Sequence, residues 1–175
     1  MNGIHITDDA FSAYGRVIPG IPAAELESAM LALPMPETGF VYQPREDTLH
    51  ALLGFAGWGM RLLADMPYQL GYCLGENERC NVLARHGGST FVYGLTAFDL
   101  LLASRAEGPA GSVRCTVPSG TFVELYGDTL RSAPLGRNMR ILVVQPYATN
   151  TEFSASSLSD GEVTARNTWT YIVKE

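Results

Sequence analysis

Alternating apolar and polar positions dominate the second half of the chain, and this pattern predicts short β-strands. Glycine-rich turns separate the strands, and the turn Pro118–Gly120 is one example. Strands this short, repeating every ~8–12 residues, are typical of a β-sandwich or barrel. The strands are expected at 68–74, 81–86, 90–94, 98–103, 112–117, 121–126 and 139–146.

The first third of the chain has a helical pattern instead. Residues 23–33 are rich in Ala, Leu, Glu and Met, and Pro34 ends this helix. A second helical segment starts at Asp47 or Thr48, but the glycines in 54–59 argue against one continuous helix there.

A length of 175 residues fits a single domain with a sizeable core. We expect residues 1–66 to form a helical and extended region that packs on a barrel core at 67–147. Residues 148–175 would supply a polar loop and a returning strand. The predicted fold class is therefore mostly β, with short N-terminal helices.

The strand at 121–126 has two distinct faces, because side chains alternate along a strand. Thr121, Val123 and Leu125 share one face. Phe122, Glu124 and Tyr126 share the other, which places a carboxylate between two aromatic rings. This combination indicates the lumen of a small barrel, where one polar group faces an apolar cavity.

The net charge of the chain limits the kinds of partner that it can be expected to bind. The net charge is −6, and no cluster of basic residues is present, which argues against nucleic acid and against an anionic membrane surface. Charged residues make up only 17% of the chain, so we expect part of the surface to be covered in a homodimer. The chain begins without a secretory signal pattern, and the odd number of cysteines suggests buried thiols, so a cytoplasmic protein is expected.

Two residues are the main candidates for chemistry. His86 ends a strand beside Gly87 and Gly88, so it is either a metal ligand or general base at the barrel mouth or a solvated turn histidine. Glu124 is either an acid, base or metal ligand in the lumen or a structural carboxylate paired with an arginine. Arg85, Arg131 and Arg140 lie in or near strands, where one could hold a substrate carboxylate or simply pair with a surface acid.

Several motifs resemble cupins. The segment VPSGTFVEL at 117–125 looks like the second cupin motif, and NVLARHGGST at 81–90 looks like an eroded first motif. The opening ITDDAFSAYGRVI resembles that of ureidoglycolate lyases, a cupin family. MPYQLGYCLGENERCNVL, VELYGDTLRSAP and ARNTW are similar to a bacterial cupin family of unknown function related to those lyases.

The resemblance implies a cupin-like jelly-roll barrel, also described as a double-stranded β-helix. It implies His86 and Glu124 as catalytic or metal-binding residues, with Arg85, Arg131, Tyr126 and Phe122 around the substrate. The usual cupin ligand set is incomplete, because Ser132 and not a histidine follows the second motif. The metal would be Mn, Ni, Zn or Fe, or there is no metal at all.

Three functions remain open at this point. The first is an enzyme of lyase or isomerase type on a small polar carbonyl compound, hydroxy acid or sugar. The second is a non-catalytic cupin that binds a small ligand after losing its metal ligands. A third and simpler reading is a structural oligomerisation module.

Overall fold

The computed structural model describes residues 3–20, 23–64, 66–80, 82–86, 88–147 and 168–172. Only the backbone is described for residues 23, 53–56, 58, 82, 85 and 168–172. Among the described residues, no helix is both long and apolar enough to cross a membrane.

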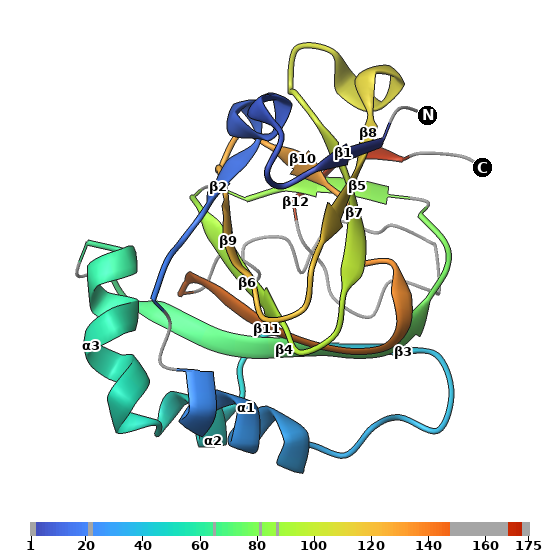
Figure 1. Ribbon diagram of the computed structural model, residues 1–175. Coiled ribbons are helices and arrows are strands. Elements are labelled where there is room, and N and C mark those ends of the chain that lie inside the picture. Colours follow the sequence, from blue (N-terminus) through green and yellow to red (C-terminus); the bar gives the residue numbers. More distant parts are fainter. Residues whose placement is uncertain are drawn as a thin grey trace.

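Strands form most of the molecule, and they lie in two facing sheets (Figure 1). The first sheet has the order β1-β8-β7-β10-β5-β12. Its strands are β1 (Gly3–His5), β8 (Val113–Val117), β7 (Phe98–Ala103), β10 (Leu130–Arg131), β5 (Val82–Arg85) and β12 (Thr168–Ile172). We call it sheet A.

The second sheet, sheet B, has the order β2-β9-β6-β11-β4-β3. Its strands are β2 (Gly15–Val17), β9 (Phe122–Leu125), β6 (Thr90–Gly94), β11 (Gly136–Pro146), β4 (Tyr68–Asn77) and β3 (Phe40–Gln43).

The strand order identifies the fold. From β4 to β11 the chain builds β4-β11-β6-β9 in sheet B and β5-β10-β7-β8 in sheet A, so that the first and last strands of the series pair with each other. This arrangement is a jelly roll, with two Greek keys rolled into one double sheet. The prediction of a mostly β, cupin-like jelly roll is confirmed.

Helices cover the outer face of sheet B. The helix α1 (Ala23–Ala32) and the short α2 (Asp47–His50) lie against β4 and β11, on the side turned away from sheet A (Figure 1). Leu26 and Met30 of α1 pack with Leu142 of β11 in one buried cluster. Sheet B is therefore covered on both faces, which explains why its strands are almost continuously apolar.

A third helix departs from the expectation. Residues 54–59 are glycine-rich, yet α3 (Leu53–Leu62) runs through them without a break. Gly59 has a packing reason, since a Cβ there would lie 2.6 Å from the ring of Tyr68. Tertiary contact with β4 thus outweighs the low helix propensity of glycine.

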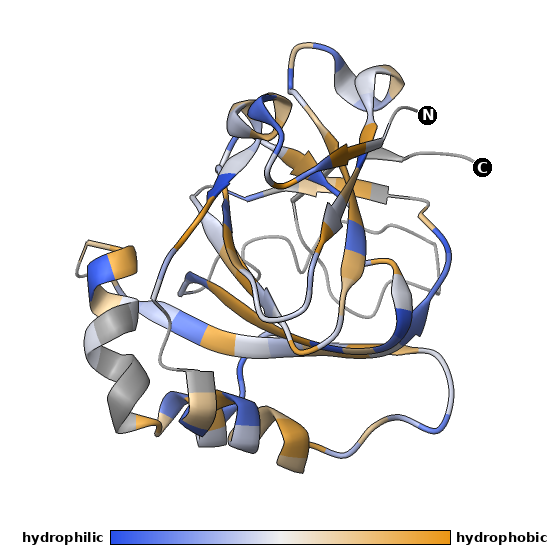
Figure 2. Cartoon of the chain, viewed as in Figure 1, coloured by the Kyte–Doolittle hydropathy of each residue, from blue (hydrophilic) through white to orange (hydrophobic). Residues whose placement is uncertain are grey.

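Smaller elements complete the chain. The 3-10 helices are η1 (Asp9–Ala13) and η2 (Gly108–Gly111). The hydrophobic residues concentrate in the strands, whereas hydrophilic ones gather in the turns (Figure 2). The returning strand predicted within residues 148–175 is present as β12, which pairs with β5; residues 148–167 and 173–175 lie outside the described residues.

Candidate functional site

The two faces of β9 do not lie where the sequence pattern predicted. Glu124 pairs with Phe91 and Phe122 pairs with Tyr93, so these four side chains share a face of sheet B. Phe91, Phe122 and Tyr93 belong to the cluster formed with α1. This is the outer, helix-covered face, and the prediction that Phe122 and Glu124 line the lumen is wrong.

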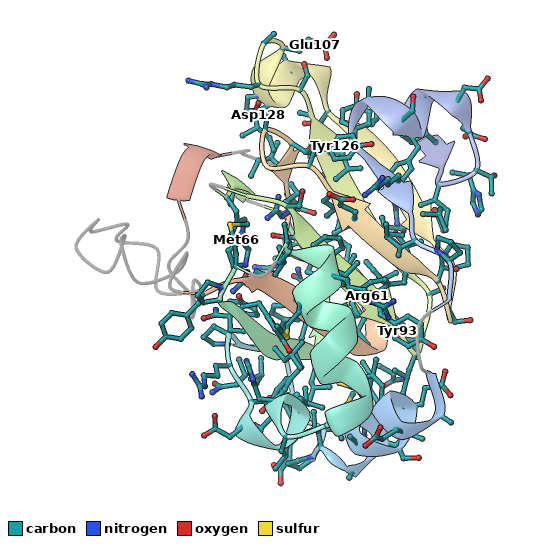
Figure 3. All side chains as sticks on the ribbon, turned by 90° about the vertical axis from the view of Figure 1, so that its left-hand side faces the viewer. Arg61, Met66, Tyr93, Glu107, Tyr126 and Asp128 are labelled. Carbon is teal, nitrogen blue, oxygen red and sulfur yellow. The ribbon has the colours of Figure 1, made fainter. Side chains whose placement is uncertain are left out.

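Glu124 has its partners on that outer face. Its Oε2 accepts a hydrogen bond from Arg16 Nε at 2.6 Å, and its Oε1 accepts one from Ser89 Oγ at 2.6 Å. The hydrogen bond and the charge of Glu124 raise the pKa of Arg16, and the half-buried Tyr126 raises it further. Tyr126 lies above α3 with Asp128, away from Tyr93 (Figure 3). Glu124 thus joins β2 to the turn that follows His86.

The interior of the jelly roll is apolar at one end. Leu100 and Cys115 of sheet A meet Val123 and Ile141 of sheet B there without solvent exposure above a few per cent. Burial raises the pKa of the Cys115 thiol to about 12 and raises that of Cys73 as well. These two cysteines are core residues, as the sequence indicated.

The other end of the interior is polar, which is unusual for a space between two sheets. Arg131 pairs with Leu102, and Leu102 belongs to the interior cluster, so the Arg131 side chain points into the interior. Sheet B contributes interior polar side chains at Gln69, Thr90 and Gln145, and each is at most 5% exposed. These groups, with His86 and Tyr42, form what we call the polar end.

Arg131 is a buried cation that has no counter-ion among the described residues. Its Nη2 donates to Thr90 Oγ1 at 2.5 Å, and its Nη1 donates weakly to the Thr129 carbonyl oxygen at 3.5 Å. Within the described part of the chain, no acidic group forms an ion pair with it. Burial lowers the pKa of Arg131 to about 9, and the guanidinium is still charged at neutral pH. A desolvated charge in this position is costly unless an anion joins it.

His86 lies near this charge. The side chain is 6% exposed, and no group of the described residues forms a hydrogen bond with its Nδ1. Burial lowers the pKa of His86 well below 6.5, and the positive charge of Arg131 lowers it further. The imidazole is therefore neutral at pH 7 and can accept a proton.

Gln145 and Tyr42 form the third part of the polar end. Gln145 Nε2 donates to Tyr42 Oη at 2.8 Å, and Gln145 Oε1 has no hydrogen-bond partner among the described groups. Tyr42 is close enough to Arg131 to oppose the fall in its pKa. The polar end therefore contains a cation, a neutral base and an unpaired carbonyl oxygen.

Two glycines let the loops around this end pack closely. A Cβ at Gly127 would lie 3.1 Å from the backbone of Gly88, and a Cβ at Gly88 would lie 3.1 Å from the ring of Pro146. The turn that carries His86 and Ser89 is thus held against the turn after β9 and the end of β11.

The ligands for a divalent metal ion are not assembled. His86 is buried near Arg131, whereas Glu124 lies on the outer face of sheet B and bonds Arg16 and Ser89. No three His, Cys, Asp or Glu side chains of the described residues form a group that could hold a metal. The charge of Arg131 beside His86 also opposes a cation. The predicted pair of metal ligands, His86 and Glu124, does not converge, and these residues fit an anion better.

The six residues predicted from the sequence therefore divide into groups. His86 and Arg131 come together at the polar end, whereas Phe122, Glu124 and Tyr126 lie elsewhere. Arg85 lies in β5, and its side chain is outside the described part. Arg140, an alternative carboxylate holder, donates instead to the carbonyl oxygens of α1.

Sequence reasoning missed Tyr42, Thr90 and Gln145. Gln145 had a signal, because it interrupts the apolar run ILVVQP of a strand. Thr90 and Tyr42 had none, since both residue types are ordinary in strands.

Solved structures show distant similarity to this chain. An oxidoreductase of the 2OG-Fe(II) oxygenase family from Burkholderia pseudomallei is 14% identical with a TM-score of 0.48, over 82% of this chain and 93% of its own. The α-ketoglutarate dependent epimerase SnoN from nogalamycin biosynthesis is 17% identical with a TM-score of 0.45, over 77% of each chain. The Drosophila melanogaster CENP-C cupin domain is 10% identical with a TM-score of 0.39, over 73% of this chain and 99% of its own.

Our fold assignment rests on the strand order and not on these scores. A search of curated proteins finds no match. A family model described as "Domain of unknown function (DUF4867)" matches residues 4–174.

Proposed function

Because the chain belongs to the family of the domain of unknown function DUF4867, we propose its function from its own site: the polar end binds a small carboxylic acid, and the protein acts on that acid as a lyase or isomerase. The resemblance to ureidoglycolate lyases favours this class of reaction. The single observation that carries the proposal is the buried guanidinium of Arg131, for which the described residues supply no acidic partner.

A carboxylate would supply the missing anion. Guanidinium and carboxylate groups form paired, charge-assisted hydrogen bonds, and a buried setting strengthens them. Thr90 already holds Nη2 of Arg131 in place, which limits the entropy lost on binding. Because the polar atoms of this end are shielded from solvent, the acid would be enclosed once bound.

His86 would act as the base. Lyases and isomerases that act on hydroxy or oxo acids commonly begin by removing a proton from carbon or oxygen, and a neutral imidazole suits this task. The Nδ1 atom is buried and has no hydrogen-bond partner among the described groups. In this proposal Glu124 holds the adjacent turn through Ser89 and does not touch the substrate.

Binding is tested by calorimetric titration with small hydroxy and oxo acids. We expect at least one acid to bind the wild type, and Arg131→Gln to weaken that binding at least about a hundredfold, as for the loss of a buried charged partner. The matched control is Arg114→Gln, because Arg114 lies on the surface in an ion pair with Asp99. Equal affinity in the wild type and Arg131→Gln would contradict the proposal.

Catalysis is tested separately, by NMR of acid protons in deuterated water. We expect the wild type to exchange a carbon-bound proton of the bound acid and His86→Gln to lose exchange while keeping affinity. His5→Gln is the control, since the His5 ring bonds Thr7 in the N-terminal turn. Tight binding without exchange or turnover would instead support the alternative, a non-catalytic cupin that binds a small acid; the incomplete metal ligand set favours that alternative.

A further inference from the structure

The side chain of Gln145 has an unusual hydrogen-bonding state. The residue has no solvent exposure, and its amide nitrogen donates to Tyr42 Oη at 2.8 Å. The carbonyl oxygen Oε1 has no hydrogen-bond partner in the part of the chain that the structure describes. A buried acceptor without a donor costs free energy, and most buried carbonyl oxygens in proteins are paired.

The position of Gln145 relates this acceptor to the cation. The register of β11 with β6 pairs Val144 with Phe91, and one further step places Gln145 beside Thr90. The hydroxyl of Thr90 accepts the hydrogen bond from Arg131. Gln145 also pairs with Gln69 across β4, so it lies in the row of polar side chains that faces the interior.

We infer that Gln145 Oε1 accepts a hydrogen bond from a hydroxyl or N–H group of the same acid whose carboxylate Arg131 holds. This inference rests on the proposed function and narrows its substrate class. The substrate is an acid that carries a donor as well as a carboxylate: a hydroxy acid, or an amide- or urea-bearing acid. A site built to satisfy one acceptor rejects an analogue that lacks the donor.

Tyr42 is the positioning residue for this acceptor. In the structure Gln145 Nε2 donates to Tyr42 Oη, and this leaves Oε1 as the end of the amide that no described group binds. Without that bond the amide can rotate and present its nitrogen, which is a donor.

The test compares acids that differ in one group. One series is propionate, lactate and pyruvate, and the other is butyrate with its terminal hydroxy and oxo derivatives. In at least one series we expect the wild type to bind the hydroxy acid at least about tenfold more tightly than the plain and oxo acids. Gln145→Met removes this preference and keeps the affinity for the plain acid.

Two further variants complete the design. Tyr42→Phe reduces the same preference without deleting the amide, and it serves if Gln145→Met does not fold. Gln43→Met is the matched control, because Gln43 is exposed and donates to the Arg45 carbonyl oxygen.

The outcomes separate this inference from the proposed function. If the three acids of each series bind equally, or the oxo acid binds tightest, while Arg131→Gln abolishes binding, the inference is overturned and the proposed function stands. If no acid binds the wild type, both are overturned.

Discussion

His86 and Ser89 are three residues apart in the sequence, yet their side chains lie toward opposite faces of sheet B. The Ser89 hydroxyl bonds Glu124 on the outer face, whereas the His86 ring lies beside Arg131 in the interior. One short turn thus connects the outer carboxylate with the interior imidazole. The two residues predicted as a catalytic pair are related through this turn and not through a shared substrate.

The protonation of His86 gives a prediction for stability. Its pKa in the folded state is well below 6.5, so below about pH 6.5 the unfolded chain binds a proton that the folded chain does not. The free energy of unfolding should therefore fall as pH falls from 7 to 5, by up to about 1.4 kcal/mol per pH unit from this group. Burial is the main cause of the low pKa of His86, and the positive charge of Arg131 lowers this pKa further.

Urea unfolding at several pH values measures this effect. In His86→Gln the free energy of unfolding should change less between pH 7 and pH 5 than in the wild type, because the variant has no imidazole to titrate at this position. His5→Gln should keep the wild-type slope. An unchanged slope in His86→Gln would show that His86 is protonated as easily in the folded protein as in the unfolded chain.

Glu124 gives a second prediction at this scale. Glu124→Gln loses the ion pair with Arg16, whose side chain is 65% exposed, so the cost in unfolding free energy should be below about 1 kcal/mol. Acid affinity should stay within about threefold of the wild type, since the polar end is unchanged. Ser89→Ala removes the same link from its other side and should behave alike. Complete loss of turnover in Glu124→Gln, with a normal melting temperature and a normal Ser89→Ala, would make Glu124 catalytic after all.

Among the elements, α1 depends on a residue far away in the sequence. Arg140 of β11 donates from Nη1 to the Met30 and Leu33 carbonyl oxygens at 2.7 and 2.8 Å. Met30 lies in the last turn of α1 and Leu33 directly follows its end, so helix geometry gives neither carbonyl oxygen a donor within the helix. We expect Arg140→Met, which keeps the apolar stem, to lower the unfolding free energy by about 1–3 kcal/mol.

Chemical denaturation with a matched arginine measures this contribution. Arg137→Met removes a similar side chain from the same strand, but Arg137 is 74% exposed in its ion pair with Glu78, so the loss should be below about 0.5 kcal/mol. If the two variants lose equal stability, Arg140 does not cap the helix.

The elements also show what a pattern can predict. Period-two alternation located the strands, and it correctly grouped Phe122 with Glu124 on one face. It could not tell which face is interior, because α1 covers one side of sheet B and sheet A covers the other, and both are apolar. The strand β10, which places Arg131, has two residues and exists only through pairing with β5 and β7. No local signal could have located it.

For the whole molecule, the fold was predictable and the site only in part. The number and spacing of the strands predicted a β-sandwich or barrel, and the resemblance to cupins narrowed this to a jelly roll. The polar end brings together residues from β3, β4, β6, β10 and β11 and from the turn after β5, and their meeting depends on the rolled topology. His86 and Arg131 could each be predicted as candidate residues from the sequence. Only the folded structure shows that no acidic group of the described residues pairs with Arg131.

Exposed apolar side chains bear on the expected homodimer. Leu31 of α1 is 61% exposed, and Val41 of the edge strand β3 is 40% exposed. We propose a homodimer on these grounds together with the low share of charged residues, 17%. Light scattering that returned the 19.0 kDa of one chain at micromolar concentration would contradict it.

The most direct test of the central claim is the position of a bound acid. A crystal of the protein soaked with a bromine-labelled small acid would locate the ligand by anomalous scattering. Our account predicts the bromine in the interior between the two sheets, with the carboxylate bonded to Arg131 and lying beside Thr90 and His86. A ligand bound only on the outer face beside Arg16 and Glu124, or an empty interior at saturating acid, would contradict it.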